Sequence, residues 1–533
     1  MIELDPVLSS LSLDDKIAQM IMVDFSGKEM DHDMEVYFGQ YNWGGVILFS
    51  KNLSDFDQTK KLISDLQVTA LAGRTKAPLL VGIDQEGGFV TQMPFARAIS
   101  PGNMAVAATR NSEFAYESAA LMAKELRSLG INMDFAPVVD INTNPGNPVI
   151  GVRSFSDNIE LAVQMAEKSV KGFQESGVAA CAKHFPGHGD TELDSHLSLP
   201  TVRKTAEYLE NADLKPFVSA IHSRVESVMT AHVFYPAIDR EKIPATFSPV
   251  IMTDILRGKL GFKGLLITDS LNMKAISDNY GYDETTFRAV SAGADILLAC
   301  GGDDIHQGIY FGLKKNVEEG KISVSRIDES VKRILRQKFR RPLSDIPFRD
   351  DPAPVMKKIA LNSITLLKND NGVLPIKPSA DNVLGIICPG IPGSQEPTLG
   401  EVMGRHSEFV KEINFDPSSD SINVDEIMLK ARECNVVLMA TFSRGKLPEM
   451  QVNIVRELQL EGKPFAVASI FNPYDIMQFD KIPAYIVSYG FRPVSLEALA
   501  EVVLGKFAPK GKLPVTIPGL FEYGRGLTFP PLS

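Results

Sequence analysis

The sequence predicts an α/β protein in two parts: an N-terminal (β/α)8 TIM-type barrel and a smaller C-terminal α/β sandwich domain with a mainly parallel sheet. Short apolar runs alternate with longer amphipathic segments, which is typical of β/α folds. The runs are continuously hydrophobic, as expected of parallel strands covered on both faces. The 533 residues exceed the roughly 250 to 300 at which a single core stops growing, so two domains are expected.

Eight apolar runs between residues 17 and 301 predict the barrel strands. They are IAQMIMVDF, GGVILF, PLLVGID, INMDFAPVVDI, VAACAKHF, SVMTAHVFY, GLLITDS and ADILLACG. In this fold the chemistry is carried by the loops that follow the strands. Asp84, His184, His232 and Asp269 each stand at the end of such a run, so we expect their side chains at one mouth of the barrel.

The domain boundary is predicted at residues 341–358, a segment dense in proline and charge that lacks periodicity. Residues 1–340 then form the barrel and residues 359–533 the second domain. In the second domain four more apolar runs alternate with helix-like segments: VLGIICPG, NVVLMATFS, PFAVASIFN and AYIVSYG.

Composition excludes several classes of protein. The formal net charge of -11 gives a field that repels polyphosphate, so a nucleic acid partner is not expected. No run reaches the roughly 18 apolar residues of a membrane span. The opening segment is acidic where an export signal is basic, so a cytoplasmic location is expected, although numbering from Met1 leaves export open. The four cysteines lack any C-x-x-C spacing and are predicted to be reduced core thiols: Cys181, Cys300, Cys388 and Cys434.

The segment KHFPGHGDTELDSH, residues 183–196, concentrates three of the eight histidines. His184 and His188 have the spacing of a helical zinc site, but Pro186 and two glycines oppose a helix there, so no metal is expected. A phosphate cradle would need a G-x-x-x-x-G-K-[ST] pattern that the segment lacks. The simplest alternative is a surface loop stiffened by hydrogen bonds between its polar side chains.

An acid/base pair explains more of this segment. Asp194 can accept the Nδ1 proton of His196 and leave Nε2 to give and take back a proton. Asp269 is the candidate nucleophile, with a helix N-cap near Leu271 as its alternative role. Asp84 is a candidate hydroxyl acceptor, with a helix cap or a salt bridge as its alternative. A general acid and a carboxylate nucleophile on opposite sides of an acetal match glycoside hydrolysis, retaining if the carboxylate attacks directly.

The same motifs resemble glycoside hydrolase family 3, in its β-N-acetylglucosaminidase branch, over almost the whole chain. In the barrel these are GGVILF, DQEGG, NPVIGVRSF, KHFPGHGDTELDSH, VMTAHV and ITDSLNMKAI. In the second domain NSITLLKNDNGVLPI and GKLPVTIP are similar to the C-terminal α/β sandwich of that family. A chance match over the fourteen positions of the histidine-bearing motif is negligible.

The resemblance implies roles for individual residues. Asp269 would form the covalent glycosyl intermediate, and His196 would be the general acid/base, oriented by Asp194. The hydroxyls and the N-acetyl group of the terminal sugar would be bound by four further residues: Asp84, Arg153, Lys183 and His184. Arg153 and Lys183 also fit surface charges or salt-bridge partners. His188 and His232 receive no role and are expected to be hydrogen-bonded structural histidines.

One departure stands out in the DQEGG segment. The family usually continues it with two arginines, where this sequence has Phe89 and Gln92. Gln92 keeps hydrogen-bonding capacity without the charge. The departure puts in doubt a preference for acidic muropeptide-type ligands but leaves the bond-breaking chemistry intact.

The leading hypothesis is an exo-acting, retaining β-N-acetylglucosaminidase without metal or organic cofactor. Its substrates would be cell-wall or chitin-derived oligosaccharides or glycopeptides that contain N-acetylglucosamine. A phosphorylase is an alternative, because a histidine acid is neutral after proton transfer and tolerates an incoming anion. Others are a β-glucosidase or β-xylosidase with a glutamate acid from the second domain, and a sugar-binding protein without turnover. The second domain is expected to be dispensable for cleavage and to narrow the mouth or aid folding.

Overall fold

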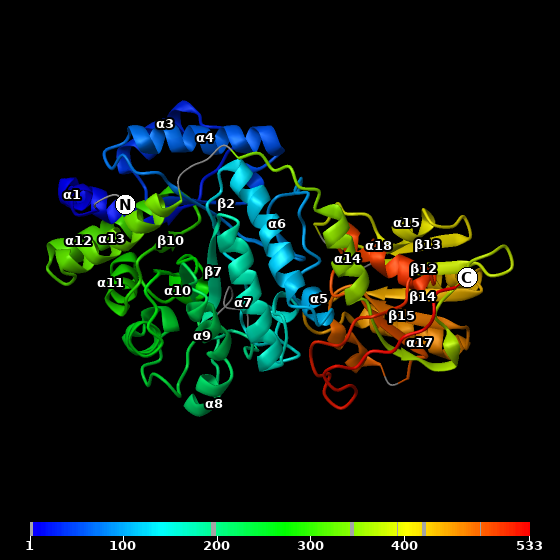
Figure 1. Cartoon of the computed structure of the whole chain (residues 1–533). Coiled ribbons are helices and arrows are strands. Elements are labelled where there is room, and N and C mark those ends of the chain that lie inside the picture. Colours follow the sequence, from blue (N-terminus) through cyan, green and yellow to red (C-terminus); the bar gives the residue numbers. More distant parts are fainter. Residues whose placement is uncertain are drawn as a thin grey trace.

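The two predicted parts of the chain are both present. The computed structural model describes residues 4–192, 199–341, 346–391, 393–417, 423–479 and 481–532. A barrel, blue to green in Figure 1, is followed by a second α/β unit, yellow to red. The α/β fold class and the order of the two parts are therefore confirmed.

Eight parallel strands form the barrel, in the order in which they occur along the chain. They are β1 (Ile21–Val23), β2 (Gly45–Leu48), β3 (Leu80–Ile83), β6 (Met133–Asp134), β7 (Ala179–Phe185), β8 (Ser227–Thr230), β9 (Leu265–Ile267) and β10 (Leu297–Ala299). Each lies within one of the eight predicted apolar runs. A parallel bridge between Ile267 and Ile296 joins β9 to the last run and brings the ring close to closure. All seven residues of β7 are buried, as expected of a strand covered on both faces.

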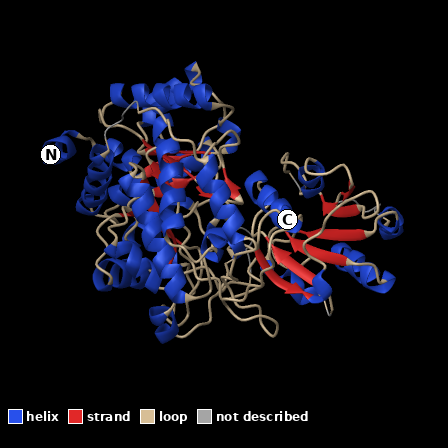
Figure 2. Cartoon of the chain, turned by 45° about the vertical axis from the view of Figure 1, so that its right-hand side comes forward, coloured by secondary structure: helices blue, strands red, loops and turns tan. Residues whose placement is uncertain are grey.

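Helices surround these strands, as Figure 2 shows. They are α1 (Leu4–Ser10), α2 (Leu13–Gln19), α3 (His32–Tyr41), α4 (Phe56–Ala72), α5 (Asn103–Ala108), α6 (Glu113–Leu129), α7 (Ile159–Glu175), α8 (Ala206–Asn211), α9 (Lys215–His222), a π-helix (Val250–Lys259), α10 (Lys274–Ser277), α11 (Tyr282–Ala292), α12 (Asp303–Glu318) and α13 (Val324–Arg340). Helix α13 buries Ile327, Val331 and Ile334, whose spacing places them on one face. Asn158 caps α7 by accepting from the amide of Leu161.

The second domain is a six-stranded sheet with helices packed against it. In sheet order the strands are β11 (Thr365–Asn369), β16 (Ala484–Val487), β15 (Phe465–Ser469), β14 (Val436–Thr441), β12 (Leu384–Pro389) and β13 (Val410–Phe415). Only the β11–β16 pair is antiparallel among these strands, so the sheet is mainly parallel as predicted. The helices are α14 (Ala353–Ser363), α15 (Leu399–Gly404), α16 (Val424–Arg432), α17 (Glu449–Glu461) and α18 (Pro493–Val503).

Helix α14 begins inside the segment 341–358 for which the sequence predicts a linker. Met356 and Ile359 on this helix pack in the core of the barrel. Ala360 and Leu361, the next two residues of the helix, pack in the core of the second domain. The helix therefore joins the two hydrophobic cores, and the exact domain limits stay a prediction.

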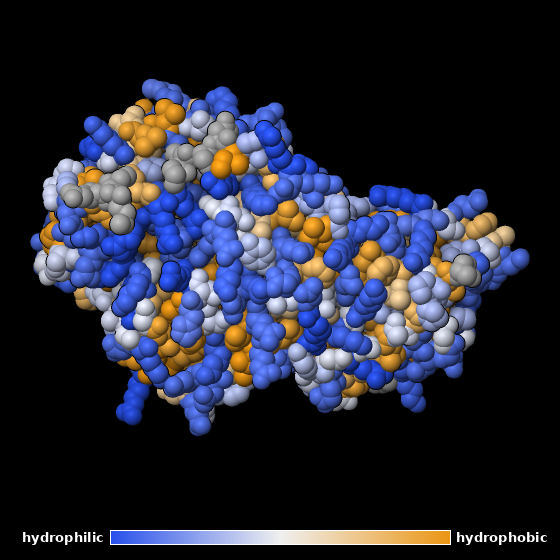
Figure 3. Space-filling model, in the orientation of Figure 1, coloured by the Kyte–Doolittle hydropathy of each residue, from blue (hydrophilic) through white to orange (hydrophobic). Residues whose placement is uncertain are grey.

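Hydrophilic residues cover most of the face shown in Figure 3, with hydrophobic residues scattered between them on both domains. No helix in the described ranges is long and apolar enough to cross a membrane. All four cysteines are buried and free, which confirms the prediction of core thiols.

Candidate active site

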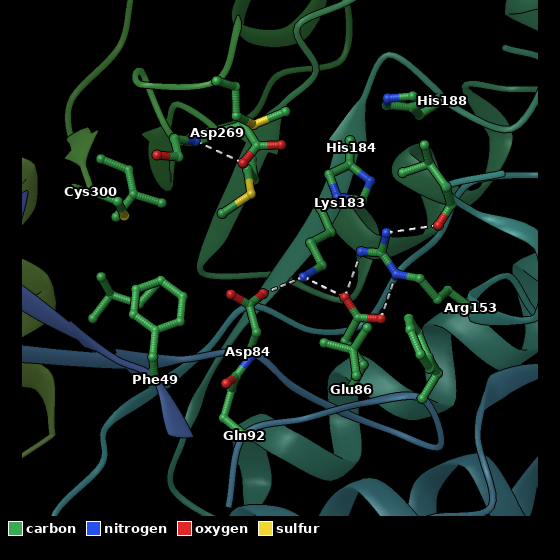
Figure 4. A pocket seen from close by; sticks show the side chains of 18 of the residues that line it. Phe49, Asp84, Glu86, Gln92, Arg153, Lys183, His184, His188, Asp269 and Cys300 are labelled. Atoms are coloured by element: carbon green, nitrogen blue, oxygen red, sulfur yellow. Dashed lines mark hydrogen bonds and ion pairs between the residues drawn. The ribbon is translucent and has the colours of Figure 1, made fainter. Parts of the chain in front are cut away.

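A cavity of about 370 Å³ opens where the barrel strands end. Asp84 follows β3, Lys183 and His184 close β7, and Asp269 follows β9, and all four side chains line the cavity (Figure 4). Arg153, from the loop after β6, lines it too. The described residues predicted to bind or attack substrate are thus brought together at the carboxyl ends of the strands, where this fold carries its chemistry.

The DQEGG segment forms a small hairpin at the mouth, from β4 (Gln85–Gly87) and β5 (Val90–Thr91). Gly88 has φ +58°, and a Cβ there would meet the Cα of Gly102 at 2.8 Å, so only glycine fits. The Gln85 side chain accepts the amide of Gln92 at 2.9 Å and so ties the hairpin together. This turn fixes where Asp84 and Glu86 present their carboxylates.

Glu86 lies at the centre of a buried network of charges in the cavity wall. Its Oε1 is 2.7 Å from Lys183 Nζ, and its two oxygens accept from Arg153 at 2.7 and 2.9 Å. Lys183 is also 2.6 Å from Asp84 Oδ1. Burial acts to raise the pKa of Glu86, but Arg153 and Lys183 outweigh it and lower that pKa to about 2. The two cations are therefore held in fixed positions by ionised partners.

Glu86 has no role in the sequence prediction, although it stands two residues after Asp84 in the same motif. Period-two spacing after a strand end was the available signal, because residues two apart in an extended segment share a face. Arg153 and Lys183 prove to be salt-bridge partners, which was their simpler reading. They line the cavity as well, so the structural and the functional readings hold together.

His184 is oriented by a second carboxylate that the sequence reasoning missed. Its Nδ1 lies 2.7 Å from Asp140 Oδ2, and the amides of His184 and His188 donate to Asp140 at 3.1 and 2.7 Å. Burial acts to raise the pKa of Asp140, but His184 outweighs it and the pKa is lowered. Because an ionised carboxylate only accepts, Nδ1 carries a proton and donates it to Asp140, which fixes the orientation of the ring. Asp140 closes the fourth apolar run, INMDFAPVVDI, which was the signal for it.

His188 also lines the cavity, and its Nδ1 lies 2.9 Å from Thr191 Oγ1. Burial, together with the neighbouring His184, lowers the pKa of His188 to about 4, so the ring is neutral at pH 7. Lys183 and His184 belong to a strand and the chain turns after Phe185, so the helical zinc spacing does not apply. In the described ranges no group of three or more His, Cys, Asp or Glu residues could hold a metal ion.

Asp269 faces the network from the other side of the cavity (Figure 4). Its Oδ1 accepts the amide of Ser270 at 2.7 Å. Burial acts to raise the pKa of Asp269, but His232, His184 and that amide outweigh it, so the pKa lies below its usual value. Helix α10 begins after Met273 without a side-chain cap, so the alternative role of Asp269 as a helix cap is wrong.

His232 is fully buried and does not line the cavity. Its Nε2 lies 3.0 Å from the carbonyl of Ser270, which only accepts, so Nε2 carries a proton; Nδ1 lies 2.7 Å from Thr246 Oγ1. The expectation of a hydrogen-bonded structural histidine is met. Its position beside Ser270 lets it favour the ionised form of Asp269.

Asp194 and His196, the predicted acid/base pair, lie outside the described residues. The chain leading to them is described as far as Glu192. Gly189 in this approach is pressed against the barrel, since a Cβ would lie 1.8 Å from the carbonyl of Ile141. The roles of the pair stay a prediction.

Phe89 and Gln92, which depart from the family pattern, both line the cavity. Gln92 Oε1 accepts the amide of Ser50 at 3.1 Å. Phe89 packs against Phe471 of the second domain with ring centroids 5.4 Å apart. Arg444 of the second domain lies over the ring of Phe89, with its Cζ 4.8 Å from the ring centroid.

Comparison with known proteins identifies the family. Residues 12–337 match the glycosyl hydrolase family 3 N terminal domain and residues 364–523 its C-terminal domain. The chain is 31% identical to Beta-hexosaminidase A of Pseudoalteromonas piscicida over 91% of either protein. It is 37% identical to Beta-hexosaminidase of Tolumonas auensis over 52% of this chain and 82% of that protein.

Among solved structures, a glycoside hydrolase family 3 beta-N-acetylglucosaminidase from Paenibacillus sp. str. FPU-7 superposes with a TM-score of 0.89. That protein is 37% identical, and the match covers 95% of this chain and 99% of the other. The two family matches together span most of the sequence, in the order of the two observed domains. The chain therefore belongs to glycosyl hydrolase family 3.

Proposed function

We propose that the protein is an exo-acting, retaining β-N-acetylglucosaminidase that removes terminal, non-reducing β-linked N-acetylglucosamine from cell-wall or chitin-derived fragments. The observation that carries the proposal is the ionised carboxylate of Asp269 in a cavity whose buried cations, Lys183 and Arg153, are already neutralised. Asp269 forms no ion pair with any described residue, so its anionic oxygen is free to attack carbon. The hexosaminidase names of the relatives favour an N-acetylated sugar.

The cavity suits one neutral, polyhydroxylated ring. Its volume of about 370 Å³ lies at the small end of ligand pockets, which fits a single terminal sugar and exo action. Asp84, partly exposed beside Lys183, can accept sugar hydroxyls while Lys183 donates to them. His184 Nε2 offers a further polar atom for a sugar hydroxyl. Such groups bind hydroxyls without requiring charge on the substrate.

The reaction then has two steps. An oxygen of Asp269 attacks the anomeric carbon while the bond to the leaving oxygen breaks, and His196 gives that oxygen its proton. Water, deprotonated by the now neutral His196, then cleaves the glycosyl ester and returns Asp269 as a carboxylate. Arg444 is the single second-domain side chain among the described residues that line the cavity, so no glutamate acid comes from the described part of that domain.

Replacement of the nucleophile is the first test. Asp269→Asn is expected to lower kcat for a nitrophenyl β-N-acetylglucosaminide by roughly a thousandfold or more, because an amide cannot form the ester. Rapid quenching of the wild type should show protein heavier by one N-acetylhexosaminyl group, and the variant should show none. Asp278→Asn, on the exposed helix end nearby, is the matched control. Full activity of Asp269→Asn would end the proposal.

The acid/base role is tested by the leaving group. His196→Ala should lose activity steeply on an alkyl glycoside and much less on a dinitrophenyl glycoside, whose leaving group needs no proton. His184→Ala should slow both substrates alike, because it binds the sugar that they share. Asp194→Asn should follow His196→Ala in a milder form. Equal losses on both substrates for His196→Ala would contradict the assignment of His196 as the acid/base.

Hydrolysis and phosphorolysis are distinguished by their products. Analysis of the released sugar with and without added phosphate shows whether water or phosphate is the acceptor.

A further inference from the structure

Arg444 is an outer part of the active-site wall and comes from the second domain. It follows β14 and lines the same cavity as Asp269. Its side chain is exposed, whereas Lys183 and His184 are buried at the depth of the cavity. If the terminal sugar occupies the depth, as the proposed function requires, Arg444 lies toward the part of the substrate that departs with the leaving oxygen.

The loop that carries Arg444 is fixed by hydrogen bonds to buried polar side chains of the second domain. Ser443 Oγ donates to Asp475 Oδ1 at 2.5 Å, and Asn472 Nδ2 donates to the carbonyl of Gly445 at 3.1 Å. Asp475 is 1% exposed. A Cβ on Gly445 would lie 3.8 Å from Pro148 of the barrel, so the loop also abuts the rim of the barrel. The backbone on each side of Arg444 is therefore fixed before any ligand arrives.

Arg444 differs from Lys183 and Arg153, the other lysine and arginine that line the cavity, because no carboxylate of the described residues is paired with it. Lys183 and Arg153 are neutralised by carboxylates inside the wall. Arg492, from the same domain and the same interface, is paired with Glu396 at 2.8 Å. Arg444 forms no ion pair within the described ranges, and its Cζ lies over the ring of Phe89. A guanidinium stacked on a ring keeps its N–H edge available for a planar anion.

We propose that Arg444 is a specificity-determining residue that binds a carboxylate on the leaving-group side of the substrate. The ligand class is a β-N-acetylglucosaminide whose aglycone is an acidic sugar or another carboxylate-bearing alcohol. The planar fork of the guanidinium matches a carboxylate with two parallel hydrogen bonds, which a neutral sugar cannot offer. The inference rests on the proposed function, because it places the scissile bond between the buried depth and Arg444.

Two aryl glycosides that differ in one group test this assignment on the full-length enzyme. One carries a meta-carboxylate on the phenyl leaving group and the other the neutral carboxamide of the same shape. The ratio of their kcat/KM values is measured in the wild type and in Arg444→Met, so that the intrinsic difference between the two leaving groups cancels. Arg444→Met is expected to lower the carboxylate-to-carboxamide ratio about tenfold. Added NaCl should lower the ratio in the wild type and leave it unchanged in the variant.

Lys446→Met is the matched control, since Lys446 is an exposed cation two residues away that does not line the cavity. It should leave the ratio unchanged, and Arg444→Lys should lie between the wild type and Arg444→Met. The same ratio in the wild type and Arg444→Met would overturn the proposal. An equal drop for Lys446→Met would overturn it too, because a diffuse field and not a contact would then be acting.

Inorganic phosphate provides a further arm. If phosphate speeds turnover to a sugar phosphate in the wild type and not in Arg444→Met, the guanidinium serves an incoming anion and the aglycone assignment is wrong. Failure of the proposed function would give a different experimental result. In that case the wild type would not release N-acetylglucosamine from the neutral carboxamide at all, whatever the residue at 444.

Discussion

Each end of the barrel holds a buried carboxylate shared by more than one cation, and the two clusters differ in their surroundings. At the carboxyl ends of the strands Glu86 is shared by Lys183 and Arg153 in the wall of a cavity. At the opposite end Asp295, which is fully buried ahead of β10, is shared by three arginines, Arg257, Arg326 and Arg333. None of the residues in this lower cluster lines the active-site cavity. The same chemistry therefore serves two purposes.

The lower cluster, formed by Asp295 and its partners, links two helices to a barrel strand through hydrogen bonds and ion pairs. Asp295 accepts from Arg257 Nη2 at 2.5 Å and from Arg333 Nη1 at 2.9 Å. It also accepts from Ser330 Oγ at 2.7 Å and from the amide of Leu266 at 3.0 Å. The π-helix, α13 and β9 thus meet on one carboxylate. The upper cluster instead fixes the directions in which cations and carboxylates face a ligand, so loss of its carboxylate should affect activity most.

Glu86→Gln is expected to have the largest effect of the changes compared here on kcat/KM. The amide leaves Lys183 and Arg153 without their shared anion, so Arg153 loses its ion pair and Lys183 is held by Asp84 alone. We expect a loss of roughly a hundredfold or more on a nitrophenyl β-N-acetylglucosaminide, together with a lower Tm. Glu167→Gln, at a half-buried ion pair with Lys171 on α7, is the control and should match the wild type. If Glu86→Gln kept a third of the wild-type kcat/KM, the cluster around Glu86 would not be needed to position the groups that face the substrate.

Asp295→Asn is expected to lower the stability of the protein and to leave its activity nearly unchanged. Removing one partner of a buried ion pair costs about 3 kcal/mol of stability, which corresponds to a decrease of roughly 5 °C or more in Tm. At 25 °C, where the protein is still folded, kcat/KM should stay within about twofold of the wild type. Thermal unfolding followed by circular dichroism and initial rates on the same preparation measure both quantities. A large loss of kcat/KM in folded Asp295→Asn would show that the lower cluster also controls the site.

Lys338→Met tests a charge at the same end of the barrel as Asp295 that is paired with no carboxylate among the described residues. Lys338 is 3% exposed, its Nζ donates to Gln19 Oε1 at 2.6 Å, and burial lowers its pKa to about 7. The unfolded chain keeps an ordinary lysine pKa near 10.5 and so binds more protons than the folded protein between pH 7 and 10.5. Lys338 therefore destabilises the fold most below pH 7, and this penalty fades as the pH rises through that window.

The variant should be more stable than the wild type by about 2 kcal/mol at pH 6.5, with the gain shrinking toward pH 10. Tm values of both proteins across that range provide the measurement. A gain that does not depend on pH would mean that Met packs better and that the charge was not the cause.

The sequence predicted the barrel well because continuous apolar runs have few other interpretations. It also brought Asp84, His184 and Asp269 to one mouth, since the ends of parallel strands share an edge. His232, expected at the same mouth, is instead fully buried and does not line the cavity. The sequence could not predict which side chains form ion pairs across the mouth of the barrel. Glu86 meets Arg153 over 67 positions of sequence separation, and no local pattern encodes such a contact.

Two other features were missed for local reasons. The proline-rich segment before residue 358 indicated a linker, yet Pro352 and Pro354 stand at the start of α14, where proline does not disturb a helix. Arg444 follows an ordinary strand in the second domain, and nothing in its neighbourhood marks it as part of a cavity in the barrel. Its position follows only from how the two domains pack.

Arg492→Met should have the smallest effect on kinetics. It tests whether the second domain supports the cluster formed by Glu86, Lys183 and Arg153. Arg492 donates from Nε to the carbonyl of Gly88 at 2.8 Å and is paired with Glu396 at 2.8 Å. Gly88 belongs to the hairpin that presents Glu86, so loss of this contact should loosen the hairpin and raise KM about threefold, with kcat changed less. Arg405→Met, an exposed arginine on the same domain, is the control. If KM rose as far as in Glu86→Gln, the hairpin would owe its geometry to the second domain, and the upper cluster would not be a property of the barrel alone.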